Sequence, residues 1–311
     1  MSLLIVGTVA FDALETPFGK SDKIVGGSAL YFSWAAAQFK SNIQLVSIIG
    51  DDYDFNEIKA LNEQGVDTSG LQVIEGGKSF FWSGRYHMDM NTRDTLATEL
   101  NVLADFDPVL PKTYRSAEFV MLGNLTPQVQ LRVLEQMEKR PKLVAMDTMN
   151  FWMEPQFIDD LKKVMKQVDI MIINDEEARQ LANEHALVKA AKEILEMGPK
   201  YLVIKKGEHG ALLFHDNDVF FAPALPLEEV FDPTGAGDTF AGGFVGYLAK
   251  TKDISFENMK RAIVFGSAMA SFCVEKFGSQ RLKEIDHYDL DERVKEFIDL
   301  VQFDITLVDE K

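Results

Sequence analysis

The sequence predicts an α/β fold in which a mainly parallel sheet is covered by helices on both faces and carries a small β-sheet lid. Short continuous apolar runs, which are typical of buried parallel strands, alternate along the chain with helical patterns. Residues 11–25 and 73–100 break this alternation with turn residues and strand patterns. With 311 residues, of which 46% are hydrophobic, the chain can form one large core with a small inserted subdomain.

The elements of the core are marked by their apolar patterns and by glycines at their ends. The apolar run of residues 3–6 ends in Gly7, as a buried strand would, and a helix over 28–40 follows the pair Gly26-Gly27. The same rhythm then predicts strand 43–49, helix 54–64, strand 119–122, helix 127–139, strand 143–146, helix 155–167, strand 170–173, helices 176–183 and 188–197, strand 201–205, and apolar helices 241–249 and 262–274.

The two segments that interrupt this rhythm are expected to form one lid. The lid would comprise residues 11–25 and 73–100, inserted into a core of residues 1–10, 26–72 and 101–311. The second lid segment contains a strand, a turn and another strand, at residues 78–88, at 89–91 and from Thr95 onward.

The first of these lid strands has two different faces. One face is apolar and carries Phe80, Trp82, Tyr86 and Met88, and the other is mixed and carries Ser79, Phe81, Ser83, Arg85 and His87. The aromatic face is expected to pack against the core or against the lid of a second copy, which would make a homodimer. On the mixed face, Arg85 is a candidate contact for an anionic group of the substrate.

Charge and cysteine content exclude several classes of function. The chain has 32 basic and 49 acidic residues, a net charge of −17, which repels nucleic acids and anionic lipids but leaves room for a small anion in a local pocket. The one cysteine excludes an intrachain disulfide and a cysteine-based zinc site. No apolar run is long enough to span a membrane, and the N-terminus lacks a basic leader region, so a cytoplasmic protein is expected.

The strongest local signal is the small-residue loop of residues 232–243, which leads into an apolar helix. Gly235 and Gly237 allow the backbone to present successive N–H groups at the helix N-terminus, which is an anion-binding arrangement. The loop matches neither a dinucleotide fingerprint nor a Walker A loop. Asp238 would repel a bound phosphate, so it suits a base that stands between a phosphate and an attacking hydroxyl. The alternative is an ordinary acidic residue in the first turn of a helix.

This loop resembles the C-terminal signature of the ribokinase-like (PfkB) carbohydrate kinases. Weaker similarities to that family occur in the same order along the chain, at residues 26–29, 50–52, 64–68, 174–177 and 205–211. The resemblance implies a ribokinase-like three-layer αβα core with a β lid. It also implies ATP-dependent transfer of the γ-phosphoryl group to a hydroxymethyl group of a small sugar. Asp238 would then be the base, and the N–H groups of Gly235, Ala236 and Gly237 would hold the charge on the phosphoryl oxygens.

The resemblance also implies roles for residues outside this loop. Asp12 would bind the hydroxyl groups of the substrate, and Gly27 would allow the substrate to approach the backbone closely. Asn174 and Glu177 would organise Mg²⁺ through water, although they also suit the first turn of a helix, and both interpretations can hold together. The loop with Lys205, Gly207 and Gly210 would bind the nucleotide.

Three positions depart from the family pattern or extend it. Tyr31 stands where the family usually has an asparagine that contacts the sugar, and Lys205 stands where threonine is common and could reach the ATP phosphates. Gly278 lies in a region that lines a potassium site in some members. A nucleoside kinase is therefore an alternative, with Tyr31, Phe81 or Trp82 stacking on a base. A non-catalytic ligand-binding protein is a third hypothesis, and the retained Asp238 argues against it.

Overall fold

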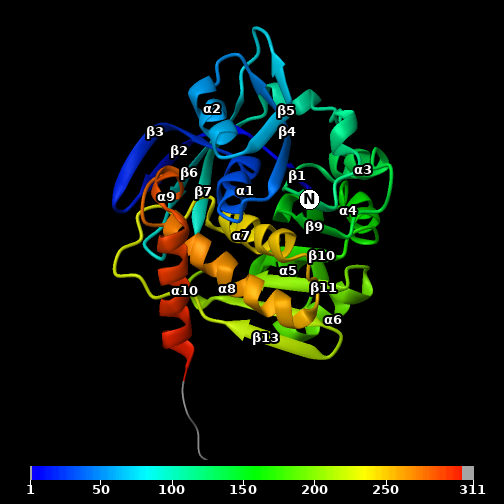
Figure 1. Ribbon diagram of the computed structural model, residues 1–311, viewed down its shortest axis with the longest axis vertical. Helices are drawn as coiled ribbons and strands as arrows, with labels where there is room; N and C mark the ends of the chain where they lie inside the picture. Colours follow the sequence, from blue (N-terminus) through cyan, green and yellow to red (C-terminus); the bar gives the residue numbers. More distant parts are fainter. Residues whose placement is uncertain (1, 303–311) are drawn as a thin grey trace, which may run out of the picture.

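The computed structural model describes residues 2–302 and confirms the predicted α/β fold (Figure 1). A nine-stranded sheet forms the centre of the molecule, and its strands pair in parallel except at β12, which runs antiparallel to both of its neighbours, β11 and β13. Its strand order is β13 (Asp218–Ala222), β12 (Ala211–His215), β11 (Tyr201–Lys205), β10 (Ile170–Asn174), β9 (Leu143–Asp147), β8 (Phe119–Leu122), β1 (Ser2–Val6), β4 (Asn42–Gly50) and β5 (Val66–Ile74).

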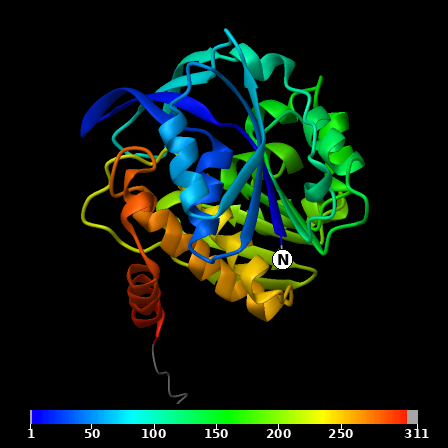
Figure 2. The same ribbon diagram turned by 45° about the horizontal axis from the view of Figure 1, so that its top comes forward.

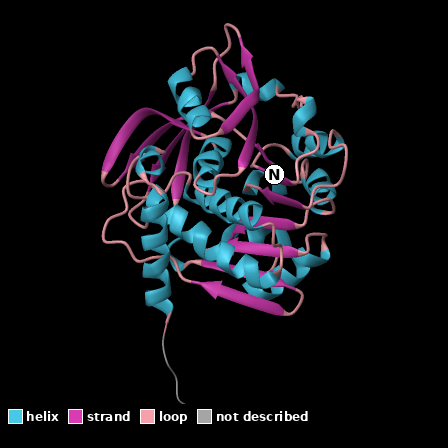
Figure 3. Ribbon diagram, viewed as in Figure 1, coloured by secondary structure: helices cyan, strands magenta, loops and turns pink. Residues whose placement is uncertain are grey.

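Helices cover both faces of this sheet, as the views in Figures 2 and 3 show. One face packs against α1 (Ser28–Ala37), α2 (Phe55–Glu63), α7 (Ala236–Thr251) and α8 (Phe256–Cys273). The other packs against α3 (Pro127–Glu135), α4 (Ile158–Met165), α5 (Asp175–Ala182) and α6 (Leu187–Glu196). Strand β1 is buried on both sides because its alternate residues serve both layers: Leu3 and Ile5 join the first cluster, and Leu4 and Val6 the second.

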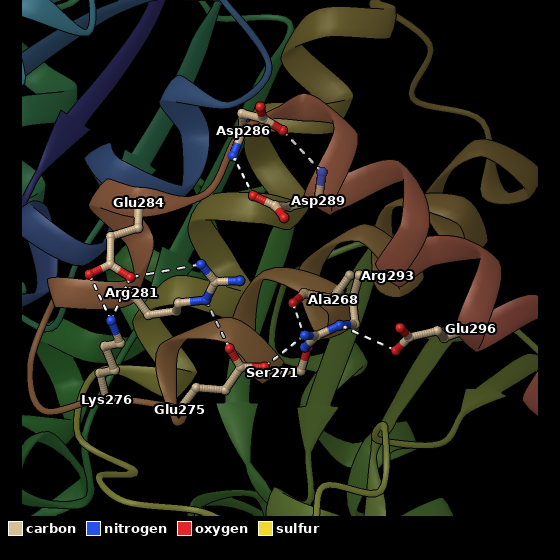
Figure 4. A network of polar contacts seen from close by, with 10 residues as sticks. All are labelled: Ala268, Ser271, Glu275, Lys276, Arg281, Glu284, Asp286, Asp289, Arg293 and Glu296. Carbon is tan, nitrogen blue, oxygen red and sulfur yellow. Dashed lines mark hydrogen bonds and ion pairs between the residues drawn. The ribbon is translucent and has the colours of Figure 1, made fainter.

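A network of ion pairs ties the C-terminal helices to the end of α8 (Figure 4). Glu275 accepts hydrogen bonds from Arg281 of α9 (Gln280–Glu284) and from Arg293 of α10 (His287–Val301), at 3.0 Å and 2.7 Å. Arg293 also donates to the Ser271 hydroxyl of α8 at 2.7 Å. The loop between α8 and α9, which carries Gly278, is therefore held from both sides.

The lid is a four-stranded sheet of order β3 (Gly19–Gly26), β2 (Ala10–Thr16), β6 (Phe80–Tyr86) and β7 (Arg93–Glu99). Strands β2 and β6 run parallel and in register, so Asp12 lies beside Trp82 and Glu15 beside Arg85. Alternate side chains of a strand point to opposite faces, so these two pairs lie on opposite faces of the lid.

Some elements differ from those expected. Helix α7 begins at Ala236 rather than at residue 241, because Gly235, in a left-handed conformation, caps it and the small residues that follow are already helical. Residues 73 and 74 end β5 in the large sheet rather than starting the lid. The hairpin β12–β13 and helices α9 and α10 were not expected. None of the helices within residues 2–302 has the length and apolar character that crossing a bilayer requires.

Candidate active site

The predicted anion-binding loop lies at the N-terminus of α7 and faces the lid. Gly235 has a φ of +76°, and a Cβ atom there would lie 2.4 Å from the ring of Tyr31, so only glycine fits. The N–H group of Ala236 donates to the Pro233 carbonyl at 3.2 Å. Of the three predicted donors, the N–H groups of Gly235 and Gly237 therefore remain without an acceptor within residues 2–302, which leaves them available to a phosphate.

Asp238 lies in the first turn of α7, is partly exposed, and stands near the buried carboxylates of Asp147 and Glu177. Burial, together with the charge of Asp147, raises the pKa of Asp238 to about 7 against the opposing charges of Lys205 and Arg93. A carboxyl group with a pKa near neutrality can take up a proton during a reaction and release it afterwards.

A buried ion pair lies behind this loop, at the carboxyl ends of two strands of the large sheet. Lys205 at the end of β11 reaches Asp147 at the end of β9, with 3.3 Å between Nζ and Oδ2. A Cβ atom on Gly237 would lie 2.9 Å from the same Nζ, so the ammonium group borders the anion-binding loop. Burial lowers the pKa of Lys205, but the carboxylates of Asp147, Glu177 and Asp238 outweigh it and the net shift is upward. Lys205 is therefore a retained positive charge.

Asn174 and Glu177 form both halves of a helix cap at the start of α5. The Asn174 side chain accepts from the Glu177 N–H at 2.8 Å, and Glu177 Oε2 accepts from the Asn174 N–H at 3.0 Å. This arrangement leaves Glu177 Oε1 for a metal-bound water, so the pair fits the predicted Mg²⁺ role as well as the structural one. Burial raises the pKa of Glu177 to about 7, and the charge of Asp147 adds to the shift.

No group of three or more histidine, cysteine or carboxylate side chains within residues 2–302 is arranged to hold a metal by itself. Magnesium commonly binds through one or two protein carboxylates together with substrate phosphates. The carboxylate of Glu177 therefore suits a Mg²⁺ ion that arrives with a nucleotide.

Asp12 lies on the site-facing side of the lid and is 5% exposed. Its carboxylate lies over Gly26, where a Cβ atom would come within 1.9 Å of Oδ2, and no donor in the described part of the chain binds it. Burial raises the pKa of Asp12 to about 8, and the charges of Asp232 and Asp238 add to the shift. A buried carboxylate without a partner is suited to bind hydroxyl groups of a ligand.

Gly27 and Tyr31 have structural roles that sequence reasoning did not anticipate. Gly27 has a φ of +97°, and a Cβ atom there would lie 2.5 Å from the Thr8 carbonyl oxygen. Its own backbone neighbours therefore require this glycine, whatever the substrate. The Tyr31 ring is 1% exposed and packs on Gly235, and its hydroxyl has no hydrogen-bond partner within residues 2–302. Tyr31 shapes the wall behind the anion-binding loop.

Two predicted nucleotide-loop glycines lie between β11 and β12. Gly207 has a φ of +54° and Gly210 a φ of +88°, so both adopt conformations that favour glycine. A Cβ atom on Gly207 would lie 2.3 Å from Oδ1 of Asn91, in the turn between β6 and β7. The tip of the lid therefore touches the nucleotide loop.

The structure does not bring Arg85 to the other candidate site residues. Its guanidinium is half exposed and lies 3.0 Å from Glu15, on the face of the lid opposite Asp12. This position does not support the expected contact between Arg85 and the substrate. Arg93, whose charge acts on Asp238 and Glu177, was missed because it fell between the turn expected at residues 89–91 and the strand predicted from Thr95.

Asp232 was also missed as an organiser of the site. It is fully buried and accepts hydrogen bonds from the N–H groups of Thr234 at 2.9 Å and Gly278 at 2.8 Å. It thereby joins the anion-binding loop to the loop that follows α8. The potassium site expected near Gly278 stays a prediction.

Comparisons with known proteins show which sequences and folds this chain resembles. The sequence model described as "pfkB family carbohydrate kinase" matches residues 14–286. The chain is 31% identical over 254 residues to the cytidine kinase of Thermococcus kodakarensis, covering 79% of this chain and 88% of that protein. It is 26% identical to the nucleoside kinase of Methanothermobacter thermautotrophicus (89% and 91% covered) and 28% identical to the ribokinase of Bacillus subtilis (90% and 92% covered).

Solved structures share the fold. The nucleoside kinase of Methanocaldococcus jannaschii superposes with a TM-score of 0.74 at 20% identity, covering 95% of this chain and 98% of that one. A protein of E. coli assigned as ribokinase II, solved with ATP and Mg²⁺, superposes with a TM-score of 0.79 at 17% identity, covering 94% and 99%.

Proposed function

This chain belongs to the pfkB family of carbohydrate kinases, and we propose that it transfers the γ-phosphoryl group of ATP to the hydroxymethyl group of a nucleoside. Its family makes it an ATP-binding phosphotransferase. A nucleoside, rather than a small sugar, is the substrate of the alternative function that the sequence suggested. It is favoured by the similarity to the cytidine and nucleoside kinases.

The observation that carries the nucleoside proposal is the pairing of Asp12 and Trp82 on one face of the lid. The two residues are register partners on adjacent strands, and the Trp82 ring is partly exposed. The carboxyl group of Asp12 can form hydrogen bonds with two hydroxyl groups of a ribose, and an indole beside it offers a surface on which a base can stack, an interaction worth about 1–3 kcal/mol. Of the three aromatic residues considered for stacking, Tyr31 is buried and Phe81 packs against the core.

In this proposal, Asp238 accepts the proton of the attacking hydroxyl group. Its pKa of about 7 keeps much of it ionised at neutral pH, yet makes it a strong enough base to hold the proton. The free N–H groups of Gly235 and Gly237 donate to the phosphoryl oxygens, where each such donor is typically worth about 3 kcal/mol in a transition state. Asp12 orients the acceptor so that its hydroxyl group faces Asp238.

Lys205 and Glu177 serve the nucleotide side of the site. Lys205 lies against Gly237 and supplies a positive charge for the phosphates. Glu177 Oε1 would hold Mg²⁺ through water, and the ion would supply positive charge to offset that of the nucleotide phosphates. Gly207 and Gly210 let the backbone between β11 and β12 turn sharply beside the nucleotide.

A panel of acceptors tests the proposal. ADP formation would be measured with ATP and Mg²⁺ for cytidine, uridine, adenosine, inosine, ribose, fructose and 2-keto-3-deoxygluconate. We expect kcat/KM for the best nucleoside to exceed that for every free sugar by at least tenfold, since a free sugar cannot use the Trp82 surface. Mass spectrometry of the product would identify the monophosphate.

The same panel separates the alternatives. Faster turnover of ribose than of any nucleoside would replace the nucleoside proposal by a sugar kinase, which the similarity to the Bacillus ribokinase already makes the second candidate. A Trp82→Ala variant adds a control, because it should raise KM for the nucleoside about tenfold or more and leave that for ribose unchanged.

A further inference from the structure

Arg93 is a cation of the lid that faces the acidic group of the active site. It begins β7 and is the register partner of Tyr86 on β6. The Tyr86 hydroxyl lies 3.2 Å from that of Thr234, in the anion-binding loop. The Arg93 guanidinium lies 5.9 Å from the ring of Trp82, on the same face of the lid as Asp12.

Two contacts join the lid to the core near Arg93. Tyr86 contacts the loop that begins α7, and the turn at Asn91 touches Gly207 of the nucleotide loop. Arg93 pairs with Tyr86 and follows Asn91 by two residues, so it lies close both to the loop that would bind the transferred phosphoryl group and to the loop that would bind the nucleotide.

The ion pairs of the described residues leave the charge of Arg93 without a partner carboxylate. Within residues 2–302 it forms no ion pair, whereas Lys205 is paired with Asp147 and Arg85 with Glu15. Burial raises the pKa values of Asp238 and Glu177, and the charge of Arg93 is among the effects that oppose this shift, which shows that its field reaches both carboxylates.

We propose that Arg93 is a catalytic residue whose guanidinium contacts the non-bridging oxygens of the γ-phosphoryl group while it is transferred. In that step the acceptor oxygen forms a bond to the γ-phosphorus as the bond to the β–γ bridging oxygen breaks. The electron pair of the broken bond stays on ADP, and the acceptor proton passes to Asp238. A guanidinium offers several N–H donors in a fixed plane, which suits the planar group of oxygens in transit.

The inference rests on the phosphoryl transfer of the proposed function and not on the nucleoside. The test therefore uses whichever acceptor of the panel, nucleoside or sugar, the wild-type enzyme phosphorylates fastest. If no nucleoside is phosphorylated, the nucleoside proposal fails while the comparison of Arg93 variants proceeds with the sugar.

The experiment compares Arg93→Ala and Arg93→Lys with Arg85→Ala, a matched change on the opposite face of the same strand pair. We expect Arg93→Ala to lower kcat by about 100-fold with a smaller change in the KM of the acceptor, and Arg93→Lys to lose less. Arg85→Ala should remain within about threefold of wild type, because its ion pair is half exposed.

Two further readouts separate catalysis from lid structure. Millimolar guanidinium should partly restore the rate of Arg93→Ala and leave Arg85→Ala unchanged. Affinity for ADP with aluminium fluoride, a mimic of the phosphoryl group in transit, should fall at least tenfold in Arg93→Ala while affinity for ADP alone is preserved. Equal kcat in the two alanine variants, or equal losses for ADP with and without aluminium fluoride, would overturn the proposal.

Discussion

Asp12 is the residue whose burial has the clearest consequence for stability. Its pKa is raised from 3.8 to about 8, first by burial and then by the charges of Asp232 and Asp238. The folded chain therefore holds a proton on Asp12 that the unfolded chain releases. This stabilisation is fully present below about pH 4 and is lost as the pH rises through 8.

Replacing Asp12 by asparagine removes this dependence, because the amide cannot ionise. The stability of Asp12→Asn relative to wild type should rise with pH, by at most about 1.4 kcal/mol per pH unit between pH 4 and 8. Thermal melts of the ligand-free proteins at pH 5, 7 and 9 would show a growing difference in Tm. Asp22→Asn, a change at an exposed lid residue, should show no such slope. A constant difference for Asp12→Asn would mean that Asp12 ionises as freely in the folded chain as in the unfolded one.

At the scale of elements, α7 connects the site to the core through its glycines. A Cβ atom on Gly242 would lie 2.6 Å from the backbone oxygen of Phe32 in α1, which cannot move without shifting that helix. A Cβ atom on Gly237 would meet only the flexible end of Lys205, at 2.9 Å. Alanine substitutions at these two positions of one helix therefore distinguish an effect on packing from an effect on catalysis.

We expect Gly242→Ala to lower the free energy of unfolding by about 1–3 kcal/mol, because α1 and α7 must separate. Gly237→Ala should leave the free energy of unfolding within about 1 kcal/mol of wild type, since alanine favours the helix. It should nevertheless lower kcat, because the added methyl group displaces Lys205 from the anion-binding loop. Urea titrations and initial rates of both variants provide the measurement. Equal stability of the two variants would contradict the account of helix packing.

The comparison of α7 with β7 shows what the sequence reveals about elements. The glycine loop and apolar run before and within α7 identified the anion-binding loop, although the helix begins earlier than its apolar pattern suggested. Strand β7 begins at Arg93, whereas the local pattern predicted a strand only from Thr95. Pairing with β6 decides where this strand starts, and pairing between segments is not visible in a local window.

At the scale of the whole molecule, tertiary packing is the reason that the sequence predicted only part of the candidate site. Motif residues such as Asp238, Asn174 and Glu177 lie at the ends of strands and helices, whose positions in an α/β sheet follow from their order. Arg93, Asp147 and Asp232 join the site through tertiary packing across the lid and the sheet. The orientation of Arg85 away from Asp12 likewise depends on strand register, which alternation alone does not fix when either face could point inward.

Global charge and local charge differ in this protein. The net charge of −17 cannot attract ATP, so in the proposed mechanism binding depends on the free N–H groups of Gly235 and Gly237, on Lys205 and Arg93, and on Mg²⁺. Several carboxylates stand close to these groups. Among them, only Asp238 would accept the proton of the attacking hydroxyl group.

The most direct test of this central claim is the rate of phosphoryl transfer by Asp238→Asn. With ATP, Mg²⁺ and the best acceptor at pH 8, we predict that kcat falls by about 10²–10⁴-fold while the Kd for ATP changes less than about threefold. Asparagine preserves the shape of the side chain, so Tm should stay close to that of wild type or rise. Turnover within tenfold of wild type would contradict the assignment of Asp238 as the base.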